Sequence, residues 1–321
     1  METVIIIVVS MNWCRGLVAA VLLAAPFGLA SCSSSTDNPA ASSSADAPPC
    51  PTAPVDVVVS VDQWGGIVSE LGGKCATVTT LLASSSVDPH EYEPSPADAA
   101  KFGGAQLVVV NGGHYDEWAA KLAAGSAPAA PVVDAVAVSG LDQNGTNPHV
   151  WYSPSAVTKV ADAVTAQLSK LAPGAADYFA QRRGEFAGSL KPYDDVIATI
   201  KKGASGKRYA ATEGVFDYMA SALGLQDATP AGYQAATNND SDPSPADLDA
   251  ILGLLRDKGV DVLVYNTQTQ GSVPEQLRSA AESAGVPVVE VTETVAPGAK
   301  SFEAWQVDQL TALAKALGVA A

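Results

Sequence analysis

With 321 residues, 47% of them hydrophobic, the chain can bury substantial cores, and its length favours a globular protein of two lobes. The formal net charge of -16 argues against binding of nucleic acid or anionic membranes through a basic surface, because those partners need clustered Lys and Arg. An acidic surface is compatible with a cation as ligand, but this inference carries little weight.

The N-terminal segment, residues 1–32, predicts a lipoprotein signal peptide. Arg15 precedes an apolar run over residues 16–30 that is too short for a membrane span and ends in small residues before Cys32. This ending resembles the bacterial lipobox, in which the cysteine is lipidated and anchors the mature protein to the outer face of the cytoplasmic membrane. An uncleaved helix with an unmodified Cys32 is the alternative, and translation starts at either Met1 or Met11.

The next segment, residues 33–54, consists mostly of Ser, Ala, Pro and Asp and predicts a disordered tether. It contains Cys50, and Cys75 follows in the folded body. Each of these cysteines lies a few residues before a predicted strand, at Val55 and Thr77 respectively. Export permits a disulfide between them, while two free thiols are the alternative, because the sequence does not supply the geometry.

Alternating strands and helices predict a first lobe over residues 55–172. The β-branched run at 55–61 is typical of a buried strand, and Ser95-Pro96-Ala97-Asp98 is typical of a helix start. The pattern indicates parallel βα units. The predicted elements are strands at 55–61, 76–82, 107–110 and 131–137, and helices at 63–71, 96–102, 117–123 and 154–171.

A linking helix is predicted over residues 173–203, since residues 175–202 carry one apolar face, although Pro192 should kink it. The βα pattern then resumes in a second lobe, residues 204–321, where Ser244-Pro245-Ala246-Asp247 repeats the earlier helix start. We expect strands at 208–212, 260–265 and 286–291, helices at 215–223, 246–258, 273–284 and 301–317, and a polar loop at 226–242.

Two of the three histidines follow a proline. His90 lies in Asp88-Pro89-His90-Glu91-Tyr92-Glu93-Pro94, and His149 in Asn147-Pro148-His149-Val150-Trp151. Proline restricts the backbone and can preorganise a ligand loop. His90 and His114 also follow predicted strands, where ligands bind in parallel sheets. Imidazole and carboxylate suit first-row divalent metals, although a lone loop histidine is more often solvated.

The order of the motifs resembles that of the metal-specific solute-binding lipoproteins of zinc and manganese ABC importers. It covers residues 55–320 and rests on residues 88–95, Asn111-Gly112, 147–151 and 212–218. The resemblance implies an α/β fold: two βα lobes with mainly parallel sheets, joined by one long rigid helix, with the metal site in the interlobe cleft.

The resemblance also implies a ligand set of two residues from each lobe. Matched by motif, these are His90 and His149 from the first lobe and Glu213 and Glu293 from the second, with Glu293 standing where the family usually has aspartate. Glu213 could instead complement a helix start, and Glu293 could be a solvated loop acid. The resemblance places no ligand at His114, which we expect at the surface or behind the ligands.

The function implied is that of an extracytoplasmic binding protein, not an enzyme, that captures Zn²⁺, or next Mn²⁺, and delivers it to an ABC permease and its ATPase. We expect a monomer. Zinc binds four N/O ligands, whereas carboxylates and higher coordination favour manganese. A secreted metal-dependent hydrolase is an alternative, although the sequence lacks His-Glu-x-x-His, a nucleophile elbow and a phosphate-binding glycine loop. A surface adhesin with the same fold is another.

Overall fold

The computed structural model describes residues 49–83, 90, 92–141, 147–239, 241–269 and 271–320. The predicted signal peptide, Cys32 and the tether up to residue 48 lie outside the described residues, as do Asp88, Pro89 and Glu91. Residues Asp46–Ala321 form one compact unit. Within the described part of the chain, no helix has both the length and the apolar character that a membrane span requires.

The first lobe is a four-stranded parallel sheet of order β2-β1-β3-β4. The Val-rich β1 is central and almost wholly buried, as its β-branched sequence predicts. The strands are β1 (Val55–Val61), β2 (Ala76–Leu82), β3 (Leu107–Val110) and β4 (Val132–Asp134). The helices are α1 (Asp62–Gly72), α2 (Pro96–Lys101), α3 (Glu117–Ser126), α4 (Ala135–Ser139) and α5 (Pro154–Leu171).

The strand expected at 131–137 is too long. It ends at Asp134, whose Oδ1 accepts a hydrogen bond of 2.8 Å from the backbone N of Ala137 and so caps α4. An aspartate that satisfies a free helix N–H starts a helix even where β-branched residues follow.

The second lobe repeats the topology of the first, with four parallel strands in the order β6-β5-β7-β8. The repeated motif also has the same role in each lobe, since Ser95 caps α2 and Ser244 caps α10. The strands are β5 (Arg208–Ala211), β6 (Gln226–Asp227), β7 (Val262–Asn266) and β8 (Val288–Val291). The helices are α8 (Asp217–Leu223), α9 (Ala231–Thr237), α10 (Pro245–Arg256), α11 (Ser272–Ala284) and α12 (Phe302–Ala316).

The loop expected at 226–242 is also wrong, because it contains β6 and α9. Both elements are short, with two and seven residues, so their sequence shows little periodicity. Tyr233 fixes α9 on the lobe: its side chain is buried, and its hydroxyl donates to the carbonyl of Thr212 at 3.1 Å.

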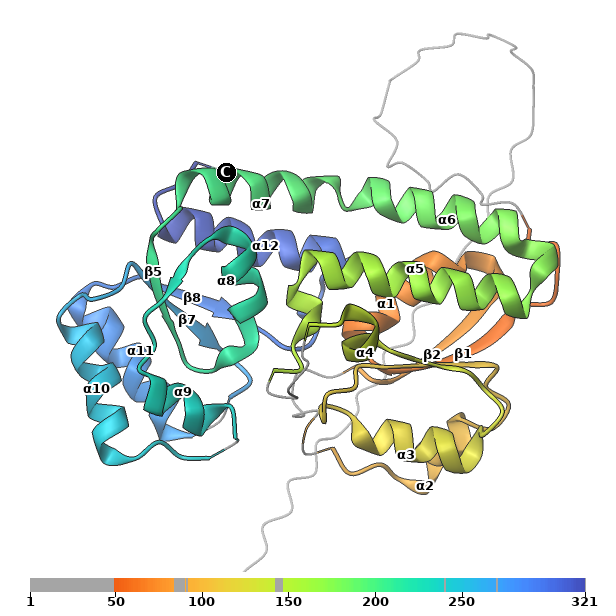
Figure 1. The fold of residues 1–321 in the computed structure, drawn as a ribbon, viewed down its shortest axis with the longest axis horizontal. Helices are drawn as coiled ribbons and strands as arrows, with labels where there is room; N and C mark the ends of the chain where they lie inside the picture. Colours follow the sequence, from red (N-terminus) through yellow and green to blue (C-terminus); the bar gives the residue numbers. More distant parts are fainter. Residues whose placement is uncertain are drawn as a thin grey trace, which may run out of the picture. The chain divides into compact units, whose positions relative to one another are not determined.

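The linking segment is two consecutive helices, α6 (Ala176–Ser189) and α7 (Lys191–Gly203). They run end to end in Figure 1, and Leu190 between them keeps a right-handed helical backbone. Pro192 lies in the first turn of α7, where its missing N–H removes no intrahelical bond. Because α6 packs on α1 and α5, while α7 packs on α8 and α12, the segment fastens one lobe at each end.

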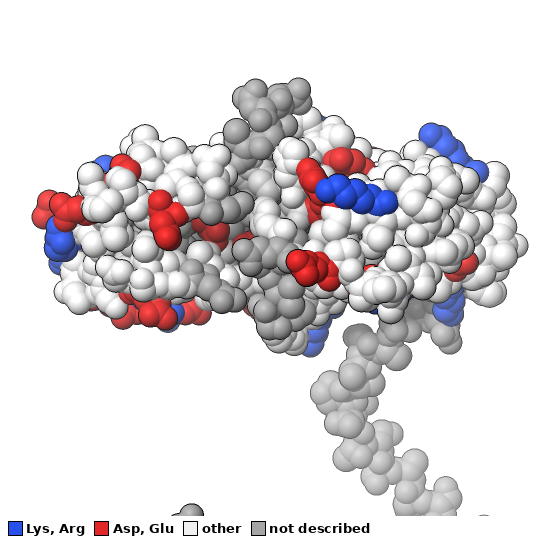
Figure 2. Space-filling model, turned by 90° about the horizontal axis from the view of Figure 1, so that it is seen from below, with Lys and Arg blue, Asp and Glu red and all other residues white. Residues whose placement is uncertain are grey.

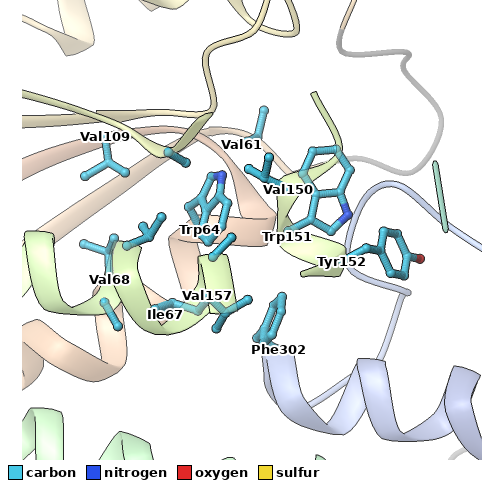
Figure 3. Close-up of a cluster of buried hydrophobic side chains, with 14 of the residues drawn as sticks. Val61, Trp64, Ile67, Val68, Val109, Val150, Trp151, Tyr152, Val157 and Phe302 are labelled. Carbon is cyan, nitrogen blue, oxygen red and sulfur yellow. The ribbon is translucent and has the colours of Figure 1, made fainter. Parts of the chain in front are cut away.

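A hydrophobic cluster extends from the first sheet into the second lobe. Figure 3 shows Trp151 and Tyr152 beside Val150, with Phe302 of α12 reaching the same cluster. The Tyr152 hydroxyl donates to the carbonyl of Thr292 at 2.7 Å, so this first-lobe residue also holds the chain that follows β8. The two lobes therefore share a packed interface beneath the ends of their strands.

The edge of the first sheet is tied to the preceding chain. Cys50 and Cys75 form a disulfide with their Cα atoms 5.0 Å apart.

On the face seen in Figure 2, the described Lys and Arg side chains are few and scattered among acidic ones, in keeping with the absence of a basic binding surface there.

Candidate metal site

Three of the side chains expected to bind metal come together between the lobes: His90, His149 and Glu293. Each offers one ligand atom, and these atoms lie within 4.8 Å of one another. His149 Nε2 is 3.7 Å from Glu293 Oε2, and the two imidazole centroids are 6.0 Å apart. His90 lies between β2 and α2 and Glu293 follows β8, so both loops lie beyond the carboxyl ends of parallel strands.

The His149 imidazole is set in one orientation. Asn147 Oδ1 accepts hydrogen bonds from both the ring Nδ1 at 2.9 Å and the backbone N of His149 at 3.0 Å. An amide oxygen can only accept, so Nδ1 carries a proton, and in the neutral ring the lone pair is therefore on Nε2. Nε2 is buried without a hydrogen-bond partner among the described residues. A buried lone pair aimed at a carboxylate is what a cation ligand requires.

Glu213 lies next to this group but does not join it. It follows β5 directly, and its Oε1 accepts short hydrogen bonds from Asn266 Nδ2 and Thr269 Oγ1. Asn266 Nδ2 also donates to Glu293 Oε1 at 2.9 Å. The two acids therefore share one amide donor, while only Glu293 reaches the histidines.

The two acids differ in their affinity for protons. Burial, together with the nearby Glu293 carboxylate, raises the pKa of Glu213 to about 7. Burial also acts to raise the pKa of Glu293. The imidazoles of His149 and His90 and the Asn266 amide together lower this pKa by more than burial raises it, so its net shift is downward. When a proton is present on this pair, Glu213 holds it.

Sequence reasoning did not identify Tyr115, which contacts ligands from both lobes. Its hydroxyl donates to Glu293 Oε2 at 3.1 Å and accepts from Gln63 Nε2 at 2.9 Å. Its ring meets His90 edge-on, with centroids 4.6 Å apart. The signal available was its place shortly after β3, at the same edge of the sheet as His90.

Two side chains at the end of β7 were also not predicted from the sequence to belong to the site. Asn266 is the last residue of that strand, and Gln268 Oε1 accepts from the backbone N of Glu293 at 2.8 Å and of Thr294 at 2.9 Å. Gln268 thus fixes the loop that carries Glu293. Both residues stand at a carboxyl strand end, which was the signal that could have found them.

His114 lies away from the three ligands. Its side chain is 76% exposed and its Nδ1 pairs with Glu117 of α3. Of the aromatic neighbours of the histidines, Trp151 packs against the His149 ring at 5.2 Å between centroids, whereas Tyr92 packs against Trp118 at 4.8 Å. Trp151 therefore forms a wall of the site, and His114 belongs to the surface.

Comparison with known proteins places this chain in a family of metal-uptake proteins. Residues 57–316 match the family described as "Zinc-uptake complex component A periplasmic". The high-affinity zinc uptake system protein ZnuA of Bacillus subtilis is 28% identical over 62% of this chain and 67% of its own length. The manganese-binding lipoprotein MntA of the same organism is 28% identical over 84% of this chain and 86% of its own length.

The same fold occurs in a solved structure. The solute-binding protein FpvC of Pseudomonas aeruginosa, in complex with Mn²⁺, superposes with a TM-score of 0.69 at 24% identity, over 83% of this chain and 98% of that one. The expected architecture of two parallel βα lobes is therefore confirmed. The zinc and manganese relatives have the same identity to this chain, 28%, so identity does not select the metal.

Proposed function

The chain belongs to the family of periplasmic zinc-uptake component A proteins, and from this premise we propose that it captures a divalent metal ion outside the cytoplasm and delivers it to an ABC permease. Zn²⁺ is the favoured ion and Mn²⁺ the next. The observation that carries the proposal is the convergence of His90, His149 and Glu293, with the buried Nε2 of His149 facing the carboxylate.

The chemistry of the donors supports a dication. Two neutral imidazoles supply nitrogen, and Glu293 and Glu213 supply oxygen and together offset the charge of the ion. Zinc accepts such a four-coordinate N/O set and exceeds manganese in intrinsic affinity for imidazole. The preference for zinc rests on this order of affinities.

We assign Glu213 as the fourth ligand, which joins the other three only when the metal binds. In the structure, Asn266 and Thr269 bind its carboxylate close to Glu293. An arriving cation would displace the proton from this acid and draw the carboxylate towards the histidines. Release would reverse this step when docking on the permease moves the lobes apart and separates Glu213 and Glu293 from His90 and His149.

The surroundings proposed for the protein follow from this role. A lipid on Cys32 would hold a monomer at the outer face of the cytoplasmic membrane, within reach of the permease and its ATPase. The relatives are solute-binding proteins, which favours a carrier over an enzyme.

Calorimetric titration of the metal-free body, residues 46–321, tests the proposal, because these residues form a compact unit by themselves. We expect one Zn²⁺ per chain, bound more tightly than Mn²⁺. The double variant Glu213→Gln/Glu293→Gln should lose most of this affinity, since it removes both anionic ligands. Absence of stoichiometric Zn²⁺ or Mn²⁺ binding would overturn the function, and unchanged titration of the double variant would overturn the ligand assignment.

A further inference from the structure

A cavity of about 420 Å³ reaches the two acids from the surface of the second lobe. Its floor includes the buried residues Thr212, Tyr233 and Glu293. Its rim includes exposed residues near α9 and the start of α11: Ser241, Asp242, Gly271 and Ser272. Every described residue that lines it belongs to the second lobe, so the cavity leads to one side of the metal site only.

Four of the six hydroxyl groups that line this cavity direct their protons into the protein. Thr237 donates to the carbonyl of Gln234 at 3.2 Å, and Ser241 donates to the carbonyl of Ala236 at 2.9 Å. Tyr233 and Thr269 likewise donate to Thr212 and Glu213. Because these four protons are engaged inside the protein, the four hydroxyl oxygens can only accept hydrogen bonds from the cavity, which adds to the acceptors of its wall.

Charge points to the same kind of ligand. Asp242 at the rim and Glu293 at the floor are carboxylates. The start of α11 has the opposite effect, because its free N–H groups carry about half a positive elementary charge. Gln268 Nε2, buried without a hydrogen-bond partner among the described residues, adds one donor. The acids outweigh these donors, so the cavity favours a cation over an anion.

A hydrated dication fits both the acceptor-rich wall and the negative charge of this cavity. Its six waters donate hydrogen bonds outward and take up about 180 Å³ in all at about 30 Å³ each. The cavity of about 420 Å³ has room for the shell and for exchange with further water. An anionic metal chelate would instead need donors, which this wall does not offer in number.

We propose that this cavity is an access vestibule, through which the hydrated metal ion enters the second lobe and meets Glu213 and Glu293 before it reaches His90 and His149. The inference rests on the proposed function and adds the route by which the ion arrives. Carboxylates replace the first waters of the ion, and the imidazoles then complete its shell. The anionic half of the site therefore receives the ion, and the histidine half retains it.

Entry of the ion through the cavity does not require the hydrogen bonds between the lobes to break. Separating the lobes to admit an ion would break the bond from Tyr115 to Glu293 at 3.1 Å, the bond from Asn147 Nδ2 to the carbonyl of Gly214 at 2.8 Å and the bond from the Tyr218 hydroxyl to the carbonyl of Asn147 at 2.9 Å. Access through the cavity leaves these bonds in place during capture.

Stopped-flow kinetics of Zn²⁺ with the metal-free body, residues 46–321, tests the vestibule. Ser272→Trp adds bulk at the rim, and Ser279→Trp is the matched control, because Ser279 is exposed on the same helix but does not line the cavity. We expect Ser272→Trp to lower the association and dissociation rates together by about tenfold, with unchanged affinity, since a barrier on the path leaves both end states alone.

A second pair of variants tests the charge. Asp242→Asn should lower the association rate several-fold at low ionic strength, and the difference from wild type should shrink as salt is added. Asp257→Asn, an exposed acid beyond the other end of α10, should leave the rate unchanged. Normal affinity with normal rates in both Ser272→Trp and Asp242→Asn would overturn the vestibule alone. Failure of the wild-type protein to bind Zn²⁺ or Mn²⁺ would overturn the proposed function itself.

Discussion

His149 in the first lobe is fixed by Asn147, whose side-chain oxygen accepts from both its ring and its backbone, whereas Glu213 in the second lobe is held by the amide of Asn266, which it shares with Glu293. The imidazole has a single orientation with its lone pair already aimed. The carboxylates have a common amide donor, and the pKa of Glu213 is raised while that of Glu293 is lowered. The first lobe therefore supplies a ligand that is already oriented, while the second lobe supplies the half of the site that we expect to change when the metal binds.

The largest effect should come from removing this oriented ligand. His149→Ala deletes a ligand whose partners are already in place, so we expect Zn²⁺ affinity to fall by at least about 100-fold in calorimetric titration. His114→Ala is the matched control, because that imidazole is exposed and pairs with Glu117. Equal affinities of the two variants would remove His149 from the site.

The orientation of the His149 imidazole can be tested separately. Asn147→Ala removes the acceptor of the His149 Nδ1 proton, and we expect a loss of about 10- to 100-fold in Zn²⁺ affinity. Asn147→Asp keeps an oxygen acceptor and loses the donor to Gly214, so most of the affinity should remain. If both variants lost affinity equally, the bond across the lobes, rather than the imidazole orientation, would be the role of Asn147.

The proton on the acidic half sharpens the comparison further. Because the pKa of Glu213 is raised to about 7, this acid is protonated below that pH and the cation must displace the proton. Zn²⁺ affinity should therefore fall as pH drops from 7 to 6, with a share of up to about tenfold due to Glu213. Glu213→Gln should bind more weakly at pH 8 and lack that share of the pH dependence. The imidazoles are common to both proteins, so a parallel pH dependence would contradict the assignment.

The smallest effect concerns the two matching helix starts. Asp98 accepts hydrogen bonds from Lys101, Ser95 and Tyr92, and these hold its pKa well below the usual range. Such stabilisation is present above the ordinary aspartate pKa and is lost as pH falls through the lowered folded-state value. In urea unfolding at pH 7, Asp98→Asn should cost about 2 kcal/mol.

Asp247 is the matched control for this test, since it stands at the same place in the second lobe. Its side chain accepts from the Ser244 hydroxyl at 2.6 Å, but it has no counterpart of the bonds from Lys101 and Tyr92 among the described contacts. Asp247→Asn should cost less, within about 1 kcal/mol. An equal loss in both variants would show that the two helix starts are equivalent after all.

Much of the fold was predictable because local signals agreed with one another. The Val-rich β1 and the Ser-Pro start of α5 place these elements where the sequence predicts them. Asp134 shortened the fourth strand by capping a helix, so one local signal prevailed over another, and α9 is too short to show a period. The place of α9 is fixed by the tertiary contact of Tyr233 with Thr212, which the sequence does not display.

The site was predictable in its residue types but not in its arrangement. The proline-histidine motifs and the family resemblance indicated four ligands. That Glu293 reaches the histidines while Glu213 turns to Asn266 and Thr269 depends on side-chain contacts across the second lobe. Tyr115 meets Glu293 across 178 positions of sequence, a pairing that no local pattern encodes.

The most direct test is a crystal structure of the zinc-loaded body, with anomalous diffraction measured on both sides of the zinc absorption edge. We expect a single strong peak between the lobes, within bonding distance of His149 Nε2, His90 and both Glu293 and Glu213, with no water in the shell. A zinc ion bound elsewhere, or one held by three residues and a water, would contradict a closed transport site made by both lobes.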